Sequence, residues 1–506
     1  MPLKIVFRCD ASATIGSGHV MRCLTLAKGL QGRGCEVSFI TRNFDDNGDG
    51  YISEAGFEVL SLPVYSSTSW LGADPDLDAE ECASLLAEVD PDWLVVDHYE
   101  IDAKWHEMVK QKSPDLQIMV LDDLADRAYS CDILSDSAYG RQRQTYSSLV
   151  NENTRLLLGS DYALLRDEFS ERREASLERR MEKLSDANVL VTLGGGDVAG
   201  PMSVVAEALK ELSMTLNFRL TVVEGGVRNR FRNLFENIDN KVEILNRADD
   251  MALRMEQADI CIGAGGGTTW ERCCLGLPTV VLTLADNQRE IVSVLEDENA
   301  AVACEIKAEE ISSSIERLLR DDDFRKSIAK RSSELCDGSG SKRVVRELLA
   351  SSIMLRKARS DDAVFVYKAR YDDDAHRYYR SQNKPDLDGH ISWFETALSD
   401  SRRQLLIARI SETDVGHVRF DFEKGNDQVA EIGIAISSAH RGKGLAVPIL
   451  VQSTRYFASN GGKTIKAEVY RDNPASQRAF EAAGFMFQTE DEDGFRQFEW
   501  NSDQLM

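Results

Sequence analysis

The order of strand-like and helix-like segments restricts the fold of this chain more than any other feature of its sequence. Through the first 350 residues, short apolar runs alternate with stretches of helical periodicity. This order is typical of parallel sheets, because two parallel strands need a crossover connection, which is usually a helix. Beyond residue 351 several strand-like runs follow one another directly, which predicts a separate α+β domain.

The alternating part consists of two halves, with a charged helical segment near 165–185 between them. In the first half we expect strands at 3–8, 36–41, 93–97 and 117–122. In the second half we expect strands at 188–193, 219–224, 241–245, 260–262 and 279–282. The sequence therefore predicts two α/β domains, 1–165 and 166–350, with ligands bound at the carboxyl ends of their strands.

The third domain is expected at 351–506. The turn sequence Asp337-Gly-Ser-Gly-Ser341 precedes a final helix at about 342–350, and a new strand begins at Ile353. Helical patterns over about 361–398 lead to expected strands at 404–410, 416–423 and 428–437.

Charge and apolar patterning exclude several classes of partner. The chain has 506 residues and a net charge of −25, which argues against a nucleic-acid partner, since a phosphate backbone is normally met by a basic surface. No apolar run approaches the ~18–20 residues of a membrane helix, and the first ten residues do not read as a signal peptide. We therefore expect a cytoplasmic protein without a membrane partner, and the sequence leaves its oligomeric state open.

The cysteine spacing points away from metal binding. Ten cysteines lie between Cys9 and Cys336, and none of them forms a CxxC pair. The adjacent Cys273 and Cys274 suit neither a zinc knuckle nor a simple disulfide. We expect buried free thiols and no bound metal.

A glycine-rich turn connects an expected strand to a helix in the last domain. The strand at 431–436 runs into Arg441-Gly-Lys-Gly-Leu-Ala446, and a helix follows to about residue 458. Such a turn presents unpaired backbone N–H groups and the positive end of a helix dipole, which suits a pyrophosphate. Taken alone, the turn is equally compatible with an ordinary strand-to-helix connection.

Further residues downstream make the pattern specific. A short strand at 468–470 precedes Asn473, and Ser476 opens a short helix that ends at Gly484. Together these segments resemble the Gcn5-related N-acetyltransferase (GNAT) superfamily over about residues 353–500. The resemblance implies a mixed, mostly antiparallel sheet, acetyl-coenzyme A as co-substrate, and a cofactor site at Ile436, Arg441, Gly442, Lys443, Gly444, Leu445, Ala446, Asn473 and Ser476.

The general acid of this domain is an open question. Members of the superfamily often use a tyrosine of the helix after the asparagine, but Phe480 stands at the matching position here. Tyr470 is a candidate substitute, although a tyrosine in a strand is commonly structural. Glu431, His417 and His390 are further candidates for the proton path, and each is also compatible with an ordinary solvated or hydrogen-bonded role.

A histidine follows a glycine-rich loop near the N-terminus. Gly16, Ser17 and Gly18 lead into His19, which opens an expected helix that also contains Arg22. The helix N-terminus disfavours a charged imidazolium, so we expect a neutral ring that can act as a base. Asp10, if it lies close, would orient the ring; the simpler alternative is that His19 only caps its helix.

Two more glycine-rich turns follow strands in the second half of the alternating part. They are Leu193-Gly-Gly-Gly-Asp197 and Gly263-Ala-Gly-Gly-Gly-Thr-Thr-Trp-Glu271. Such loops can hold a diphosphate, and the carboxylate of Glu271 is suited to accept two ribose hydroxyls. These observations favour a nucleotide-sugar ligand.

Six short motifs narrow this interpretation. With the two facing α/β domains, the chain is similar to enzymes of the glycosyltransferase-B architecture, and over about residues 3–345 it resembles the UDP-2,4-diacetamido-2,4,6-trideoxy-β-L-altropyranose hydrolase family of pseudaminic acid biosynthesis. The residues that carry the resemblance are those at 16–22, 96–99, 121–124, 162–166, 193–197 and 286–288.

The resemblance implies that water attacks the anomeric carbon and that UDP leaves. It places His19 as the base and Asp10, Asp97 and Tyr99 around the sugar or the water. Substrate-binding residues are expected in the same loop and helix, at Gly16, Ser17, Gly18 and Arg22. UDP would be held by Gly195, Gly266, Gly267, Thr268, Glu271, Asn287 and Gln288. Asp97 and Asp122 both end strands, so capping of the following loops is an alternative role for each.

The two resemblances support one another, because a GNAT enzyme acetylates the 4-amine of the UDP-amino sugar just before the hydrolase acts in that pathway. The expected function is a bifunctional acetyltransferase and UDP-sugar hydrolase. Two alternatives stay open: a glycosyltransferase-B-type transferase fused to an acetyltransferase of other specificity, or a chain in which one module only senses its ligand.

Overall fold

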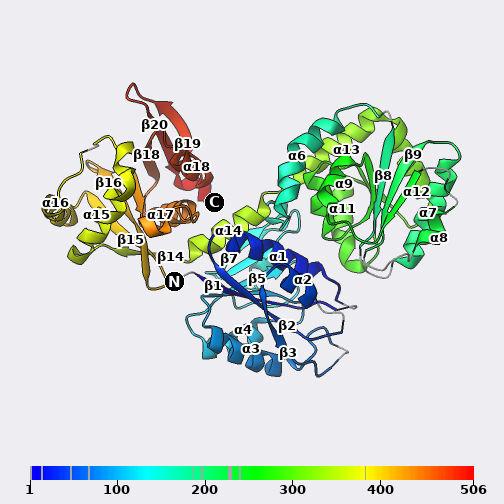
Figure 1. The fold of residues 1–506 in the computed structure, drawn as a ribbon, viewed down its shortest axis with the longest axis horizontal. Coiled ribbons are helices and arrows are strands. Elements are labelled where there is room, and N and C mark those ends of the chain that lie inside the picture. Colours follow the sequence, from blue (N-terminus) through cyan, green and yellow to red (C-terminus); the bar gives the residue numbers. More distant parts are fainter. Residues whose placement is uncertain are drawn as a thin grey trace. The chain divides into compact units, whose positions relative to one another are not determined.

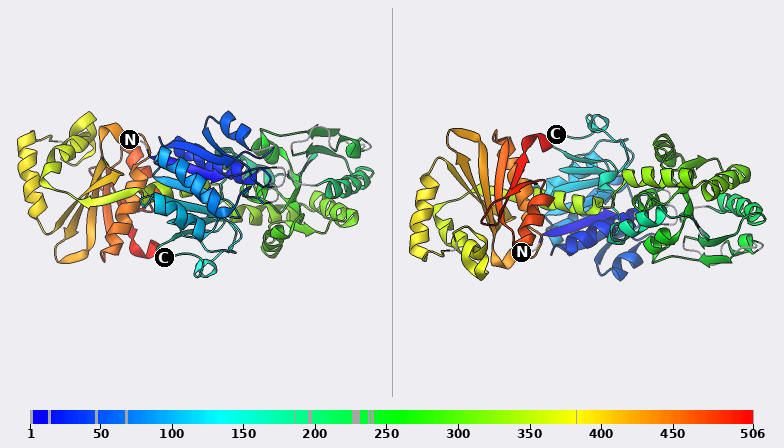
Figure 2. Two further views of the ribbon diagram at one scale, coloured as in Figure 1. Left: turned by 90° about the horizontal axis from the view of Figure 1, so that it is seen from below. Right: turned by 90° about the horizontal axis from the view of Figure 1, so that it is seen from above.

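The computed structural model describes residues 3–12, 15–45, 48–66, 69–184, 186–194, 198–225, 231–236, 238, 241–381 and 383–505. The chain divides into two compact units, Lys4–Val344 and Met1–Leu3 with Val345–Met506. Their described residues form three sheets, two in the first unit and one in the second. Figure 1 labels the elements, and Figure 2 shows the same sheets from two further sides.

The first sheet has seven parallel strands in the order β3-β2-β1-β4-β5-β6-β7. The strands are β1 (Lys4–Cys9), β2 (Glu36–Arg42), β3 (Glu58–Leu62), β4 (Trp93–Asp97), β5 (Gln117–Asp122), β6 (Ile133–Asp136) and β7 (Arg155–Leu158). The helices between them are α1 (Gly18–Gln31), α2 (Asp49–Glu54), α3 (Pro75–Val89), α4 (Ala103–Lys112) and α5 (Arg143–Tyr146). The strand order reverses between β1 and β4, which is where such sheets bind ligands.

The second sheet has six parallel strands in the order β10-β9-β8-β11-β12-β13. They are β8 (Ala187–Thr192), β9 (Phe218–Val223), β10 (Lys241–Leu245), β11 (Ile260–Ala264), β12 (Thr279–Leu282) and β13 (Val302–Cys304). The helices are α6 (Asp167–Arg180), α7 (Ala199–Ser213), α8 (Arg232–Phe235), α9 (Met251–Gln257), α10 (Thr268–Cys274), α11 (Arg289–Asp297), α12 (Ala308–Arg320) and α13 (Asp322–Leu335). The order here reverses between β8 and β11.

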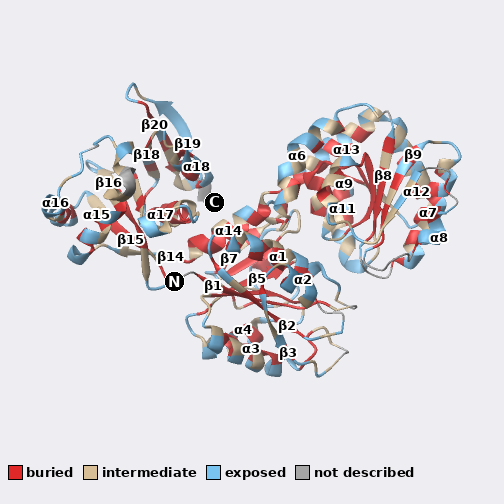
Figure 3. Cartoon of the chain, in the orientation of Figure 1, coloured by how far each residue is buried: buried red, intermediate tan, exposed pale blue. Residues whose placement is uncertain are grey.

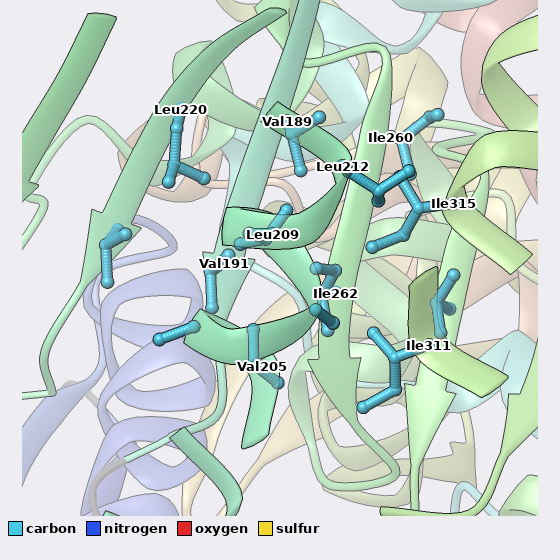
Figure 4. Packing of buried hydrophobic residues seen from close by; sticks show 14 of the residues in the cluster. Val189, Val191, Val205, Leu209, Leu212, Leu220, Ile260, Ile262, Ile311 and Ile315 are labelled. Carbon is cyan, nitrogen blue, oxygen red and sulfur yellow. The ribbon is translucent and has the colours of Figure 1, made fainter. Parts of the chain in front are cut away.

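Helices cover both faces of the second sheet, so its strands are apolar on both sides. Val189 and Val191 of β8 pack with Leu209 of α7 and Ile315 of α12 on one face, as Figure 4 shows. Leu190 belongs to a second cluster, which includes residues of α6, α9 and α10. Because successive side chains of a strand point to opposite faces of the sheet, the short run at 187–192 is covered on both faces.

The third sheet is mixed, in the order β14-β15-β16-β17-β18-β20-β19. Its strands are β14 (Ile353–Lys357), β15 (Arg403–Ile410), β16 (Thr413–Glu423), β17 (Asn426–Ile436), β18 (Thr464–Tyr470), β19 (Met486–Glu490) and β20 (Phe495–Asn501), with only β17 and β18 paired in parallel. Its helices are α15 (Ala363–Tyr371), α16 (Leu387–Ser399), α17 (Ala446–Ser459) and α18 (Pro474–Ala482).

Both faces of the third sheet are also covered. Leu405 and Ile407 of β15 pack with Phe394 of α16 and Val366 of α15. On the other face, Phe420 stacks on Phe457 of α17, with ring centroids 5.2 Å apart. Figure 3 shows buried residues along these strands and exposed ones on the outer sides of the helices.

One helix belongs to both units. In α14 (Gly340–Ser351) the boundary between the units falls after Val344. The hydroxyl of Ser341 donates to the Leu165 carbonyl in the first unit. Later in the same helix, Glu347 is 3% exposed and forms an ion pair with Arg455 of α17.

The structure confirms the buried free thiols, since all ten cysteines are unpaired and nine are buried. No helix among the described residues is long and apolar enough to span a membrane. The expected domain boundaries at 165 and 350 stay predictions.

Candidate functional site

The carboxyl ends of β1 and β4 bring His19 and Asp97 together. Asp97 is the last residue of β4, and His19 is the second residue of α1, in the connection that follows β1. The His19 Nδ1 atom lies 2.6 Å from Oδ1 of Asp97, and the histidine is 7% exposed. We assign the ring proton to Nδ1, because a carboxylate accepts it there, which leaves Nε2 as the basic atom.

Arg22 fixes the position of the Asp97 carboxylate. Its Nε and Nη2 atoms each lie 2.6 Å from one oxygen of Asp97, and Nη1 donates to Asp123 at 2.9 Å. Burial by itself would raise the pKa of Asp97, but Arg22 and then His19 hold this pKa well below its usual range. The carboxylate therefore stays charged and orients the imidazole.

Tyr99 and Trp70 form an aromatic wall beside His19. The ring centroids of Tyr99 and His19 are 4.7 Å apart with an edge-on geometry, and Trp70 stacks on Tyr99 at 5.4 Å. The Tyr99 hydroxyl donates to Asp123 at 3.0 Å, and burial followed by this carboxylate raises the pKa of Tyr99. Tyr99 thus stays protonated and able to donate a hydrogen bond.

The structure does not place Asp10 against His19, contrary to the expectation that it orients the ring. Asp10 is fully buried, where its carboxylate pairs with Arg8 at 2.7 Å and accepts from the Arg42 N–H at 2.6 Å. The Nε2 atom of His98 lies 3.5 Å from the same carboxylate. Asp10 therefore belongs to a buried ion network beneath the site, and Asp97 orients the histidine in its place.

The remaining residues of the first loop divide into exposed and structural ones. Gly16 has φ +78°, and Gly16, Ser17 and Gly18 are all exposed, so this loop is open to a ligand. Asp122 accepts from the N–H of Ala125 at 2.8 Å and from the hydroxyl of Tyr146 at 2.7 Å. Asp122 therefore caps the loop that follows β5, which is the alternative role that the sequence suggested for it.

The second set of candidate residues lies after β11. Gly266 and Gly267 precede α10, and the side chain of Gln288 lies beside this turn, 3.9 Å from where a Cβ of Gly266 would stand. Arg272 holds the turn from below by donating to the Ala264 carbonyl at 2.7 Å and to the Thr268 hydroxyl at 2.9 Å. Asn287 lies in the short 3-10 helix Asp286–Gln288 that also carries Gln288. Gly195 lies outside the described residues.

Glu271 is a carboxylate with a shifted titration. Burial raises its pKa to about 7, although Arg166, whose Nη2 lies 3.9 Å away, and Arg272 oppose the shift. The carboxylate is thus half protonated near neutral pH, and only its charged form accepts hydrogen bonds at both oxygens.

The predicted binding of UDP at this turn should depend on the charge of Glu271. Since the ionised fraction drops with a pKa of about 7, we expect the Kd for UDP to rise about tenfold between pH 8 and pH 6, measured by titration calorimetry. In Glu271→Gln the same titration should be nearly flat, and any slope it keeps reports the phosphate of UDP itself. If the Kd for UDP depended equally steeply on pH in the wild type and in Glu271→Gln, Glu271 would not be a ligand of UDP.

In the third sheet, the loop between β17 and α17 has the backbone shape expected of a cofactor loop. Gly442 and Gly444 have φ +75° and +73°, a region that favours glycine. Among the described residues, the N–H groups of 442–445 donate to no backbone carbonyl. A ligand phosphate is suited to accept from them.

The side chain of Arg441 turns back toward the protein. It donates to the carbonyls of Ile436, Ala369 and Asp372, at 3.0, 2.8 and 3.2 Å. Arg441 thus ties the loop to the end of α15. Lys443 is exposed, Leu445 is buried, and Ala446 opens α17.

Strands β17 and β18 separate beside this loop. Their pairing runs from Val429–Thr464 to Glu431–Lys466, yet β17 continues to Ile436 and β18 to Tyr470. The unpaired ends leave backbone groups free between the strands, where an extended ligand can bind. The side chain of Asn473 caps α18 by accepting from the N–H of Ser476 at 3.2 Å.

Phe480 belongs to the core of this domain. It is 4% exposed and lies edge-on to Phe485 at 5.0 Å. Tyr470 is half-buried, with its ring 5.2 Å from Phe495. The structure therefore offers Phe480 no part in proton transfer and leaves Tyr470 as a candidate donor.

Two of the ionisable candidates, His417 of β16 and Glu431 of β17, share one face of the sheet, and the third, His390, belongs to α16. Burial first, and then Arg370 and Arg419, lower the pKa of His417 to about 3. Burial and Arg370 lower the pKa of His390 as well. Glu431 is exposed, although partial desolvation and then Glu468 raise its pKa. Glu431 is thus the group of the three best suited to accept a proton near neutral pH.

Trp70, Asp123 and Arg166 are site residues without a clear sequence signal of their own. Asp123 and Arg166 stand in two of the motifs at 121–124 and 162–166, but only the structure shows their contacts to Arg22 and Glu271. Trp70 lies in a loop without any repeated pattern.

Two protein-family models each match a part of the chain. Residues 352–486 match the acetyltransferase (GNAT) domain family, and residues 189–346 match the glycosyltransferase family 28 C-terminal domain. The chain therefore contains a GNAT domain and a domain related to glycosyltransferases of family 28.

Curated relatives align with nearly all of the chain or with a part of it. An uncharacterized protein of Methanocaldococcus jannaschii is 24% identical, with 96% of both chains covered. The spore coat polysaccharide biosynthesis protein SpsG of Bacillus subtilis is 26% identical over 66% of this chain and 94% of its own length. The UDP-2,4-diacetamido-2,4,6-trideoxy-β-L-altropyranose hydrolase of Campylobacter jejuni is 26% identical over 41% of this chain and 66% of its own length.

A solved structure shows the fold of the first unit. MurG of Acinetobacter baumannii is 14% identical and superimposes with a TM-score of 0.51 over 68% of this chain and 98% of its own. The expected fold class is confirmed: two Rossmann-like sheets of the glycosyltransferase-B type, followed by a GNAT domain with a mixed sheet.

Proposed function

We propose that this chain is a bifunctional, cytoplasmic enzyme of pseudaminic acid biosynthesis. Its C-terminal module acetylates the 4-amine of a UDP-4-amino sugar with acetyl-coenzyme A. Its N-terminal module then hydrolyses the product, UDP-2,4-diacetamido-2,4,6-trideoxy-β-L-altropyranose, to free sugar and UDP. The relationship to the hydrolase of Campylobacter jejuni and the GNAT domain in one chain support this pairing.

The observation that carries the hydrolase proposal is the contact of 2.6 Å between His19 and Asp97 at the reversal point of the first sheet. With its proton on Nδ1, the ring takes a proton from water through Nε2. The oxygen of this water bonds to the anomeric carbon while the bond to the UDP oxygen breaks, and UDP leaves with that electron pair. Asp97 stabilises the imidazolium that forms.

The glycine-rich turn after β11 is the proposed UDP site. Gly266, Gly267 and Thr268 present backbone groups to the diphosphate, and Glu271 accepts the ribose hydroxyls. Asn287 and Gln288 lie in the neighbouring 3-10 helix, where they are suited to contact the same nucleotide. The proposed hydrolase involves no metal.

In the acetyltransferase, the backbone of Gly442–Ala446 is the proposed pyrophosphate site of acetyl-coenzyme A, with Asn473 and Ser476 shaping the next segment. The acceptor amine attacks the thioester directly, so that the nitrogen–carbon bond forms as the carbon–sulfur bond breaks. Glu431 takes the amine proton, and Tyr470 or water protonates the leaving thiolate.

The decisive experiment uses the intact chain. Incubated with the UDP-4-amino sugar and acetyl-coenzyme A, it should release coenzyme A, UDP and a free diacetamido sugar, identified by mass spectrometry. Omission of acetyl-coenzyme A should stop the formation of this sugar. Formation of UDP without acetylation would separate the two activities and argue against the sequence of steps.

The match to glycosyltransferase family 28 and the likeness to MurG favour one other function, transfer of the sugar to an acceptor. The two reactions differ in what receives the anomeric carbon. Release of UDP and free sugar without any added acceptor supports the hydrolase, and strict dependence on an acceptor supports the transferase.

A further inference from the structure

The face of the third sheet under α15 gathers two arginines and two buried histidines that the proposed reaction does not yet use. His417 and Arg419 stand two residues apart on β16, so their side chains leave the same face. They pair across to Ala435 and Gly433 of β17. Arg370 comes from α15 and His390 from α16.

Each histidine has a ring nitrogen without a partner. His390 is 1% exposed and His417 is 4% exposed. Among the described residues, Nε2 of His390 and Nδ1 of His417 are buried and make no hydrogen bond. Because burial and the arginines lower the pKa of both rings, each is neutral and its free nitrogen is an acceptor. Such groups are costly to bury unless a ligand donates to them.

The two guanidinium groups are close enough to repel each other. The carbon atom Cζ of Arg370 lies over the ring of Tyr379 at 4.8 Å, and none of the ion pairs between described residues includes Arg370. Arg419 pairs with Asp421 at 2.6 Å, while burial and then Arg370 lower the pKa of Arg419. Asp421 also pairs with Arg403 at 2.8 Å, so the carboxylates of Asp421 and Glu431 face three arginines, which leaves a positive charge for an anion to neutralise.

Small residues on β17 leave room for the side chain of Arg419, whose guanidinium lies above Gly433. Gly433 carries no side chain, and a Cβ there would stand 3.7 Å from Nη2 of Arg419. The next residue on the same face is Ala435, and the previous one is Glu431, where β17 and β18 begin to separate. From Glu431 to Ala435, this face therefore presents first the Glu431 carboxylate, then Arg419 opposite Gly433, and then His417 opposite Ala435.

We infer that this face is the acceptor site of the acetyltransferase and that Arg370 and Arg419 bind the phosphate groups of a phosphorylated amino sugar. The unpartnered nitrogens of His390 and His417 accept from its hydroxyl or amide groups, and Glu431 faces the amine. The inference rests on the proposed function, and it names the nucleoside diphosphate as the part of the acceptor that is recognised.

The site is also joined to the cofactor loop. Arg441 donates to the carbonyl of Ala369, the residue before Arg370, and to that of Asp372. The hydrogen bonds of Arg441 therefore hold the cofactor loop against the backbone next to Arg370. The proposed anion site and the cofactor loop are thus connected directly.

The test compares three acceptors in the full-length chain by the initial rate of thiol release: the UDP-linked amino sugar, its 1-phosphate and its neutral methyl glycoside. A charge-assisted hydrogen bond contributes about 10- to 100-fold in affinity. We expect the KM of the wild type to be lower by at least that factor for the UDP-linked acceptor than for the glycoside. Arg370→Met and Arg419→Met should each raise the KM for the UDP-linked acceptor about 10- to 100-fold and so reduce this discrimination.

Two control variants separate binding from folding. Arg402, whose side chain is 64% exposed, lies in the same domain, and Arg402→Met should leave the discrimination unchanged. Arg370→Lys keeps the charge and should lose less discrimination than Arg370→Met. Equal KM values for the glycoside and the UDP-linked acceptor in the wild type would overturn the inference, as would an equal rise for both acceptors in the arginine variants.

The outcomes also distinguish the inference from the proposed function. If the KM for the 1-phosphate equals that for the UDP-linked sugar, the arginines recognise phosphate, but a single phosphate group is sufficient. Thiol release only with a peptide amine would reject the proposed function, and the inference with it. If the wild type acetylates the UDP-linked sugar and the arginine variants keep the wild-type KM, the inference is rejected and the proposed function stands.

Discussion

Replacement of His19 by alanine should lower the rate of UDP release from the diacetamido sugar by about 10²- to 10⁴-fold, the usual contribution of a positioned general base. The substitution removes the imidazole that Asp97 orients, so no base remains to take the proton of the attacking water. The rate is measured by coupled detection of UDP. Acetyl transfer by the same protein should keep its wild-type rate, because the described contacts of His19 are to Trp70, Asp97 and Tyr99 of its own domain.

Two further variants make this result specific. Asp97→Asn keeps the shape of the side chain but can bind the wrong tautomer of the ring, so it should also lose most of the UDP release. His106 is a buried histidine of the same domain, whose neighbours are Trp105 and Tyr129, and His106→Ala serves as the matched control. If His106→Ala lost as much activity as His19→Ala, a general loss of structure would explain both.

Replacement of Glu431 by glutamine should lower the rate of acetyl transfer by about 10²- to 10³-fold and leave UDP release unchanged. Partial burial and Glu468 raise the pKa of Glu431, which brings the carboxylate closer to the range in which it can take and return a proton. The measurement is thiol release as a function of pH.

Glu468 provides an independent check, because it acts on Glu431 through charge. Since Glu468 raises the pKa of Glu431, Glu468→Gln should lower that pKa and move the acidic limb of the pH profile to lower pH. Glu431→Gln that keeps more than half of the wild-type rate would exclude Glu431 as the base. A large loss in Tyr470→Phe with little change in Glu431→Gln would assign the proton path to the tyrosine.

The central strands of each sheet could be predicted from the sequence because burial on both faces makes them continuous apolar runs. The expected bounds at 93–97, 117–122 and 279–282 agree with the buried strands β4, β5 and β12, and those at 241–245 agree with β10, an edge strand that is only partly buried. Strands β3, β6, β7, β13, β19 and β20 are absent from the predicted set. The first four have three to five residues each, and β3, β7 and β13 lie at sheet edges, so their apolar signal is short. All five residues of β19 are exposed, so that strand carries no buried apolar pattern.

The candidate sites were predictable where a loop follows a strand, and not where contacts come from distant segments. His19 and Gly442 stand in recognisable strand–turn–helix sequences. By contrast, the partner of His19 is Asp97, 78 residues away, and the sequence alone does not distinguish Asp97 from Asp10 as the carboxylate that reaches it. Arg370 and Arg419 are brought to one face only by the packing of α15 on the sheet.

Helix α14 determines how the two activities can be separated in the laboratory. A recombinant acetyltransferase that started at residue 351 would lack Glu347, a carboxylate with 3% exposure that pairs with Arg455 of α17. It would also lose the bond from Arg346 to the Ala482 carbonyl at the end of α18. A fragment that starts before Gly340 keeps both, and it is the better choice for crystallisation of the acetyltransferase alone.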